Sequence, residues 1–132
     1  MPALPFHALE LLPDSPEGQP AGLRVAAGER QEHPEISATL VDLVSLQPWD
    51  KEAVSNAVKA SGKVVVLYED TFSSSFGAEV AAWINENCFE YLDAPVMRCG
   101  SLDTAIPMSK VLEDDFLAKA RLGEVITKLL SY

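Results

Sequence analysis

KVVVLYEDTFSSSFGAEVAAWINENCFEYL, residues 63–92, is the stretch that decides the fold. It opens with the continuous apolar run Val64 to Tyr68, which is too short for a buried helix and is typical of a parallel strand buried on both faces. Polar residues follow, among them three serines that can cap a helix. Apolar residues then recur with the period of one helix face, at Phe76, Val80, Trp83, Ile84, Cys88, Tyr91 and Leu92. The stretch therefore predicts a strand, a polar turn and a helix.

Similar signals lie on both sides of this stretch. Upstream, an apolar strand is followed by a turn, by Asp50 as a helix N-cap and by Gly62 as the residue that ends the helix. Downstream, a short strand leads through a loop to a last amphipathic helix. The additional elements expected are a strand over Thr39 to Leu46, a helix over 50–62, a strand over Ala94 to Cys99, a loop over Gly100 to Lys110 and a helix over Lys119 to Ser131.

The alternation of strands and helices predicts an α/β fold with parallel strands. Ligands of such sheets gather at the carboxyl ends of the strands, where the loops 47–50, 69–75 and 100–104 are expected to meet. The candidate residues at this edge are Glu69, Asp70, Thr71 and Ser75.

The chemistry of that edge is open. A glycine-rich phosphate cradle is absent from the sequence, and an anion at the helix N-terminus would meet Glu69, Asp70 and Glu79. Two adjacent carboxylates without a third ligand are usually solvated rather than metal-bound. Because Ser73 to Ser75 have no histidine base in register and no nucleophile-elbow pattern, they are more typical of helix caps than of nucleophiles.

Composition sets outer limits on the protein. Its 132 residues, 48% apolar and 23% charged, fit one globular domain. A net charge of −10 argues against nucleic acid and anionic membrane surfaces and favours a basic protein partner, although solubility alone also explains acidic chains. No apolar run approaches the roughly 20 residues of a membrane span. The absence of a signal-peptide pattern and two cysteines that read as free thiols indicate a cytoplasmic location.

Residues 1–35 form a different kind of segment, rich in proline and glycine. Prolines at this density oppose long helices and central strands, so we expect an irregular segment with a possible short helix or strand. Leu4 to Leu12 could make a short helix, Pro13 to Pro20 a linker, and Leu23 to Ala27 a strand or the start of a helix. Residues 36–132 are expected to form the folded domain.

Four stretches carry a family resemblance: LVDLVSLQPWDKEAV, VVVLYEDTFSSSFGAEVAAWI, CFEYLDAPVMRCGSLDTAIP and LEDDFLAKARLGEVITKLL. Over about residues 36–132 they resemble, in order and spacing, the C-terminal domain of the β part of thiamine-diphosphate-dependent 2-oxoacid dehydrogenases, the E1 component. The wording FEYLDAPV, GSLDT and LEDDFL looks most like the branched-chain, or 2-oxoisovalerate, type. The resemblance implies a three-layer α/β/α sandwich with a mostly parallel sheet, like the transketolase C-terminal domain.

The sequence also departs from that family. The family usually has glycines at the positions of Ser74 and Ser75, in a T-x-G-G-F-G-A-E pattern. It also carries another strand and a full helix before the strand at Thr39, and Leu23 to Ser37 is too short for both, so the N-terminal part looks shortened. By this resemblance, the domains that bind the cofactor are expected to lie outside these 132 residues. No catalytic, cofactor-binding or metal-binding residue is therefore expected in this chain, and thiamine diphosphate with Mg²⁺ belongs to the complete enzyme.

What remains by resemblance is a role in assembly. In the family this domain helps to pair the β subunits and to dock the small basic subunit-binding domain of the acyltransferase component, E2. The matching positions here are Asp93 and Tyr132, which could also be an ordinary turn residue and a frayed chain end. Expected partners are the remaining E1 parts, that E2 domain and a second copy of this chain. Two functions remain open: part of an oxidative decarboxylase of branched-chain 2-oxoacids, or a non-catalytic assembly module.

Overall fold

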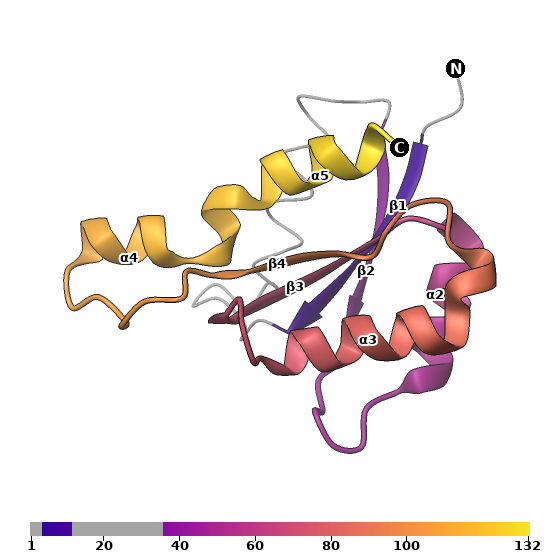
Figure 1. Cartoon of the computed structure of the whole chain (residues 1–132), viewed down its shortest axis with the longest axis horizontal. Coiled ribbons are helices and arrows are strands. Elements are labelled where there is room, and N and C mark those ends of the chain that lie inside the picture. The colour runs from indigo at the N-terminus through magenta and orange to yellow at the C-terminus, as the bar shows by residue number, and fades with distance from the viewer. Residues whose placement is uncertain (1–3, 12–35) are drawn as a thin grey trace.

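The computed structural model describes residues 4–11 and 36–132 (Figure 1). Its sheet has the strand order β2-β1-β3-β4, and every pairing is parallel. The strands are β1 (Leu4–Leu11), β2 (Ile36–Asp42), β3 (Val64–Thr71) and β4 (Met97–Ser101). The helices are α2 (Lys51–Ser61), α3 (Phe76–Cys88), α4 (Lys110–Phe116) and α5 (Leu122–Leu130), with 3-10 turns η1 (Phe89–Tyr91) and η2 (Ala118–Arg121).

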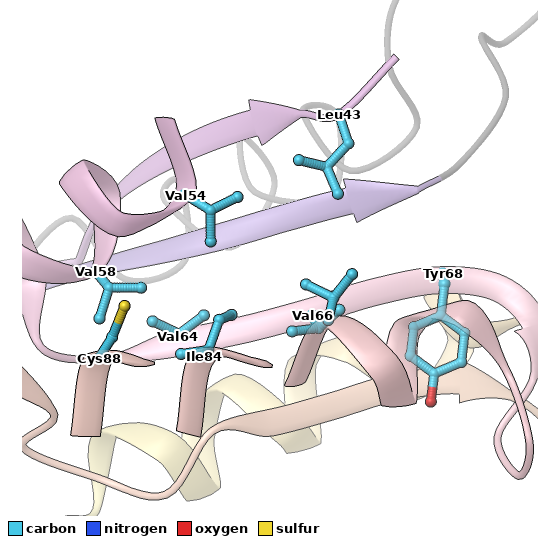
Figure 2. Packing of buried hydrophobic residues seen from close by; sticks show 9 residues of the cluster. Leu43, Val54, Val58, Val64, Val66, Tyr68, Ile84 and Cys88 are labelled. Atoms are coloured by element: carbon cyan, nitrogen blue, oxygen red, sulfur yellow. The ribbon is translucent and has the colours of Figure 1, made fainter. Parts of the chain in front are cut away.

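The described part is a three-layer sandwich, as the sequence predicted. Helices α2 and α3 cover one face of the sheet, and α5 covers the other (Figure 1). Strand β3 serves both faces because its alternate side chains point to opposite sides. Its residues Val64, Val66 and Tyr68 pack with α2 and α3 (Figure 2), while Val65 and Leu67 pack with α5. This double burial explains why the run Val64 to Tyr68 is apolar without alternation.

Capping residues mark both ends of helix α2. The Asp50 carboxylate accepts a hydrogen bond from the Ala53 N–H at 2.9 Å, so α2 has the N-cap that the sequence predicted. Gly62 ends α2 in the left-handed conformation, with φ of 69°.

Among the described residues, no helix is long and apolar enough to cross a membrane.

Strand β1 corrects the reading of the N-terminus, because the short helix expected over Leu4 to Leu12 is wrong. The segment is instead an interior strand that pairs with β2 on one side and β3 on the other. Its pairing with β3 begins only at His7, so Pro5 lies in a part that has a single neighbour, where a missing N–H is tolerated. A strand therefore does precede the one at Thr39, and it lies upstream of Leu23. The linker and the element expected over Pro13 to Pro20 and Leu23 to Ala27 lie outside the described residues.

Several boundaries also differ from expectation. Strand β2 covers Ile36–Asp42 rather than Thr39 to Leu46, because Val44 has a φ of 53° and its N–H bonds the Asp42 carboxylate at 3.0 Å, which turns the chain. Strand β4 covers Met97–Ser101 rather than Ala94 to Cys99. The loop expected up to Lys110 is followed by the unpredicted helix α4, and the last helix begins with η2 and ends at Leu130.

Candidate functional site

The carboxyl ends of β3 and β4 meet as the parallel topology predicted. Asp103, in the loop after β4, accepts two hydrogen bonds from Ser73, one from the N–H at 2.8 Å and one from the hydroxyl at 2.7 Å. The Phe72 N–H also donates to the Ser101 carbonyl at 2.9 Å. The hydrogen bonds from Ser73 hold the pKa of Asp103 below its ordinary value of 3.8. The two loops therefore form one connected surface.

Tyr68 and Arg98 support this surface from inside the sheet. The Tyr68 hydroxyl donates to the Phe72 carbonyl at 3.1 Å, and Arg98 Nη1 donates to the same oxygen at 3.0 Å. The Arg98 guanidinium also lies 4.1 Å from the centre of the Phe72 ring. Buried Ser101 donates its hydroxyl to the Glu69 carbonyl. These contacts fix the backbone of residues 69–73 rather than presenting reactive groups.

The candidate residues at this edge have mainly structural contacts. Ser75 is buried and accepts the Ala78 N–H at 3.3 Å, so it caps α3. Ser74 adopts φ of 57°, the left-handed conformation that a glycine accommodates without strain. The Thr71 N–H donates to the Asp70 carboxylate at 2.8 Å, and the Thr71 hydroxyl donates to the Ser73 carbonyl at 3.3 Å.

Of the three loops expected to meet, the structure joins two. The third, Gln47 to Asp50, follows β2, and β1 separates β2 from β3 in the sheet. Among the described residues, no hydrogen bond links this loop to the ends of β3 and β4. Its Trp49 instead packs edge-on against Trp83 of α3, with ring centres 5.0 Å apart.

A shallow hollow of about 230 Å³ lies beside the end of β3. Its walls combine carboxylates with apolar side chains: Glu69, Asp70, Thr71, Ile106, Glu113, Phe116 and Leu117. No group of three or more histidine, cysteine, aspartate or glutamate side chains within the described residues could hold a metal ion.

Asp93 and Tyr132 lie away from this hollow. The Asp93 N–H donates to the Gly62 carbonyl at 2.8 Å, which places Asp93 beside the turn that enters β3. Tyr132 follows α5, whose end lies towards the amino-terminal ends of the strands (Figure 1), and it is exposed. Both residues are thus at the amino-terminal edge of the sheet, opposite the hollow.

Three polar residues of this architecture were missed by the sequence analysis. Asp103 and Arg98 are described above, and Arg121 donates to the carbonyls of Asp115, Gly100, Phe116 and Leu117. Asp103 lies in the loop 100–104, which the sequence predicted at this edge of the sheet, so its position in the sequence could have identified it as a candidate. The contacts of Arg98 with Phe72 and of Arg121 with Gly100 had no such signal, because they join a side chain to a backbone carbonyl of a distant segment.

Comparisons with known proteins agree with this architecture. The family model described as "Transketolase, C-terminal domain" matches residues 18–121. The 2-oxoisovalerate dehydrogenase subunit beta 2 of Arabidopsis thaliana is 40% identical over 74% of this chain and 27% of its own length. The 2-oxoisovalerate dehydrogenase subunit beta of Bacillus subtilis is 44% identical over 69% of this chain and 28% of its own length. The pyruvate dehydrogenase E1 component subunit beta of Leifsonia xyli is 36% identical over 98% of this chain and 40% of its own length.

A solved structure shows the same fold. The chain titled "Split gene transketolase, inactive beta4 tetramer" superposes with a TM-score of 0.69, 23% identity, and coverage of 98% of this chain and 39% of that one. This chain spans about a quarter of the length of the first curated relatives that it matches. The matched model covers most of the chain, and the relatives are beta subunits of 2-oxoacid dehydrogenases. The chain therefore belongs to the transketolase C-terminal domain family, and it is similar to part of the beta subunits of 2-oxoisovalerate and pyruvate dehydrogenases.

Proposed function

We propose that this chain serves as the C-terminal domain of the E1 component of a 2-oxoacid dehydrogenase, in subunit assembly and in docking E2. The observation that carries the proposal is its 40% and 44% identity to two branched-chain beta subunits. Branched-chain 2-oxoacids are accordingly the proposed substrates of the complete enzyme. Its other proposed partners are the remaining E1 parts and a second copy of this chain.

The proposed role contains no chemistry on this chain itself. Among the described residues, no group of three or more histidine, cysteine, aspartate or glutamate side chains is placed to hold a metal ion. Binding of thiamine diphosphate with Mg²⁺ is assigned in this proposal to the parts of E1 that this chain does not cover. Titration calorimetry with thiamine diphosphate and Mg²⁺ should give no saturable heat, and a micromolar isotherm would refute this assignment.

For E2 docking we propose the amino-terminal edge of the sheet, with Asp93 and Tyr132 as contacts. Asp93 is exposed, and its N–H donates a hydrogen bond to the Gly62 carbonyl. Because its backbone is held in place, its carboxylate can contact a basic group of a partner. Tyr132 offers an exposed ring. A net charge of −10 supports attraction of a basic domain over distance.

Surface plasmon resonance with the subunit-binding domain of a branched-chain E2 tests the docking site. Asp93→Lys and deletion of Tyr132 should each weaken binding, and rising salt should slow association because exposed charges are screened. Glu69→Lys, at the opposite edge, makes the same change in net charge and serves as the control. If Glu69→Lys weakens binding as much as Asp93→Lys does, only net charge matters and the site assignment fails.

The second candidate is a non-catalytic binding or assembly module derived from the same domain. As a stand-alone module it would assemble with other proteins and contribute to no decarboxylase. The first function would be favoured by a neighbouring gene that encodes the cofactor-binding parts. It would also be favoured if mixing the two gene products restored decarboxylation.

The cytoplasmic location stays a prediction, which fractionation of cells with an antibody against the chain would test.

A further inference from the structure

The hollow beside the end of β3 has a size that suits one long side chain. Its volume is about 230 Å³, below the roughly 300–1,000 Å³ of pockets that bind drug-sized molecules and cofactors. Its lining combines acidic with apolar side chains, from the acids Glu69, Asp70 and Glu113 to the apolar Ile106, Phe116 and Leu117. A small hollow of this composition is better matched to a side chain of another protein than to a whole cofactor.

Hydrogen bonds tie together the segments that line the hollow. The Leu102 N–H, directly after β4, donates to the Phe116 carbonyl at 3.1 Å, and Arg121 Nη2 donates to the same carbonyl at 3.0 Å. On the side of the strands, the Ser101 hydroxyl donates to the Glu69 carbonyl. The hollow therefore does not need a partner in order to form, which lowers the entropic cost of filling it.

The end of α4 supplies both an apolar surface and a carboxylate. Glu113, Phe116 and Leu117 follow the spacing i, i+3 and i+4, so they lie on one side of the chain, and all three line the hollow. Leu112 lies one helical turn before Phe116 and is 59% exposed, and Ile106 of the preceding loop is 74% exposed. The apolar surface of the hollow thus continues outwards, where a partner can cover it.

The carboxylates of the hollow are available to a cation. Glu69 and Asp70 form no ion pair with any other residue in the described part of the chain. Glu113 pairs with Lys110 at 3.7 Å, but both side chains lie largely in water. An exposed pair of this kind contributes at most about 1 kcal/mol, so a cation from a partner can replace Lys110.

Arginine is the side chain that matches these features best. Its planar guanidinium has donors on several sides, so it can meet carboxylates from both β3 and α4, while its stem covers apolar surface. Lysine is a more strongly hydrated point charge. A free amino acid would bring its own carboxylate into an acidic hollow, whereas an arginine inside a polypeptide does not.

We propose that the hollow binds an arginine side chain of another protein, from a segment whose apolar residues flank the arginine and contact Ile106 and Leu112. The hollow lies at the carboxyl-terminal edge of the sheet, whereas the E2 domain is proposed to dock at the amino-terminal edge. The inference therefore does not rest on the proposed function, and either one can fail while the other stands.

Nuclear magnetic resonance of the isotope-labelled chain, titrated with a short peptide, tests this site. The probe is the pentapeptide Ala-Leu-Arg-Leu-Ala with both ends blocked, so arginine carries its only charge. The amide signals of Glu69, Thr71 and Glu113 should shift with a dissociation constant of about 0.1–1 mM. Replacing arginine by citrulline, which keeps the shape but lacks the charge, or both leucines by glycine should weaken binding at least about fivefold. The absence of a saturable shift at about 5 mM, or equal binding of the citrulline peptide, overturns the proposal.

Substitutions in the chain separate the hollow from the effect of net charge. Glu69→Gln and Glu113→Gln should each weaken binding of the arginine peptide about three- to tenfold, because each removes one carboxylate acceptor. Glu86→Gln makes the same change at an exposed residue of α3, on the other face of the sheet, and should leave binding unchanged. Circular dichroism confirms that each variant is folded. If all three variants weaken binding equally, the peptide responds to net charge alone and the hollow is not its site.

Discussion

The ring of Tyr68 lies directly against the α-carbon of Gly77, with no room for a side chain between them. A Cβ atom on Gly77 would lie 2.7 Å from Tyr68 Cγ and still closer to two other ring carbons. On the other side of the ring, a Cβ atom on Gly100 would lie 2.5 Å from Tyr68 Cε2. The buried ring is therefore held between the first turn of α3 and β4, and its hydroxyl reaches the Phe72 carbonyl.

Gly77→Ala should destabilise the domain by about 1–3 kcal/mol, because the methyl group must displace a buried ring or part α3 from the sheet. Chemical denaturation followed by circular dichroism measures the loss. Gly123→Ala, in the partly exposed first turn of α5, is the matched control and should be neutral or stabilising, since alanine favours a helix. Equal stability of the two variants would mean that the ring of Tyr68 moves freely.

Ser74→Gly should stabilise the domain by about 0.5–1 kcal/mol. Ser74 has φ of 57°, a conformation that strains a residue with a Cβ atom but not glycine. Ser73→Gly, one residue earlier, should destabilise instead, because it removes the hydroxyl that donates to Asp103 at 2.7 Å. Thermal unfolding of both variants compares them, and a lower melting temperature for Ser74→Gly would contradict the assigned backbone conformation.

Trp83→Ala should cost about 1–3 kcal/mol, less than full burial of a tryptophan would give. Trp83 lies on the apolar stripe of α3 but is only partly buried, packing edge-on against Trp49 with Lys51 Nζ 5.6 Å from its ring centre. A double-mutant cycle with Trp49→Ala should give a coupling of about 0.5–1.5 kcal/mol. A coupling near zero would show that the two rings do not stabilise each other.

The hydrogen bonds between Ser73 and Asp103 should make the free energy of unfolding depend on pH in the acidic range. Because hydrogen bonds from Ser73 lower the pKa of the folded Asp103 carboxyl below 3.8, its contribution is complete above that value and is lost as the pH falls through the lower, folded pKa. Denaturant titrations of wild type and Ser73→Ala should therefore differ most above pH 3.8 and converge as the pH falls through the folded pKa of Asp103. A constant difference across this range would show that the carboxylate is not the group responsible.

The Cys99 thiol should react very slowly in the folded protein. Burial raises its pKa to about 11, which Arg121 offsets only in part, and its sulfur donates to the Ala118 carbonyl at 3.3 Å. The thiolate is the reactive form, so at pH 8 a disulfide reagent should modify the folded chain far more slowly than the urea-unfolded chain. Cys88→Ser reports Cys99 alone, and rapid labelling of the folded variant would contradict the burial of this thiol.

The sequence by itself determined the parts whose signals are local. The unbroken apolar run from Val64 to Tyr68 requires two covered faces, and the structure covers them with helices on both sides. The 3.6-residue period places Val80, Ile84 and Cys88 on the buried side of α3, while Asp50 and Ser75 cap their helices as their side chains allow. Each of these features depends on residues within a few positions of one another, which is why the pattern suffices.

Only the tertiary structure decided the features that join distant residues. Leu4 to Leu11 contains a proline and gives no clear period, yet it becomes an interior strand because β2 and β3 both supply hydrogen-bond partners. Ser73 and Asp103, 30 positions apart, meet because parallel strands end at the same edge of the sheet. Asp93 and Glu69, both exposed acids, lie at opposite edges because β3 runs between them. Their neighbours, and hence their possible partners, are set by strand order and direction, which no stretch of the sequence encodes alone.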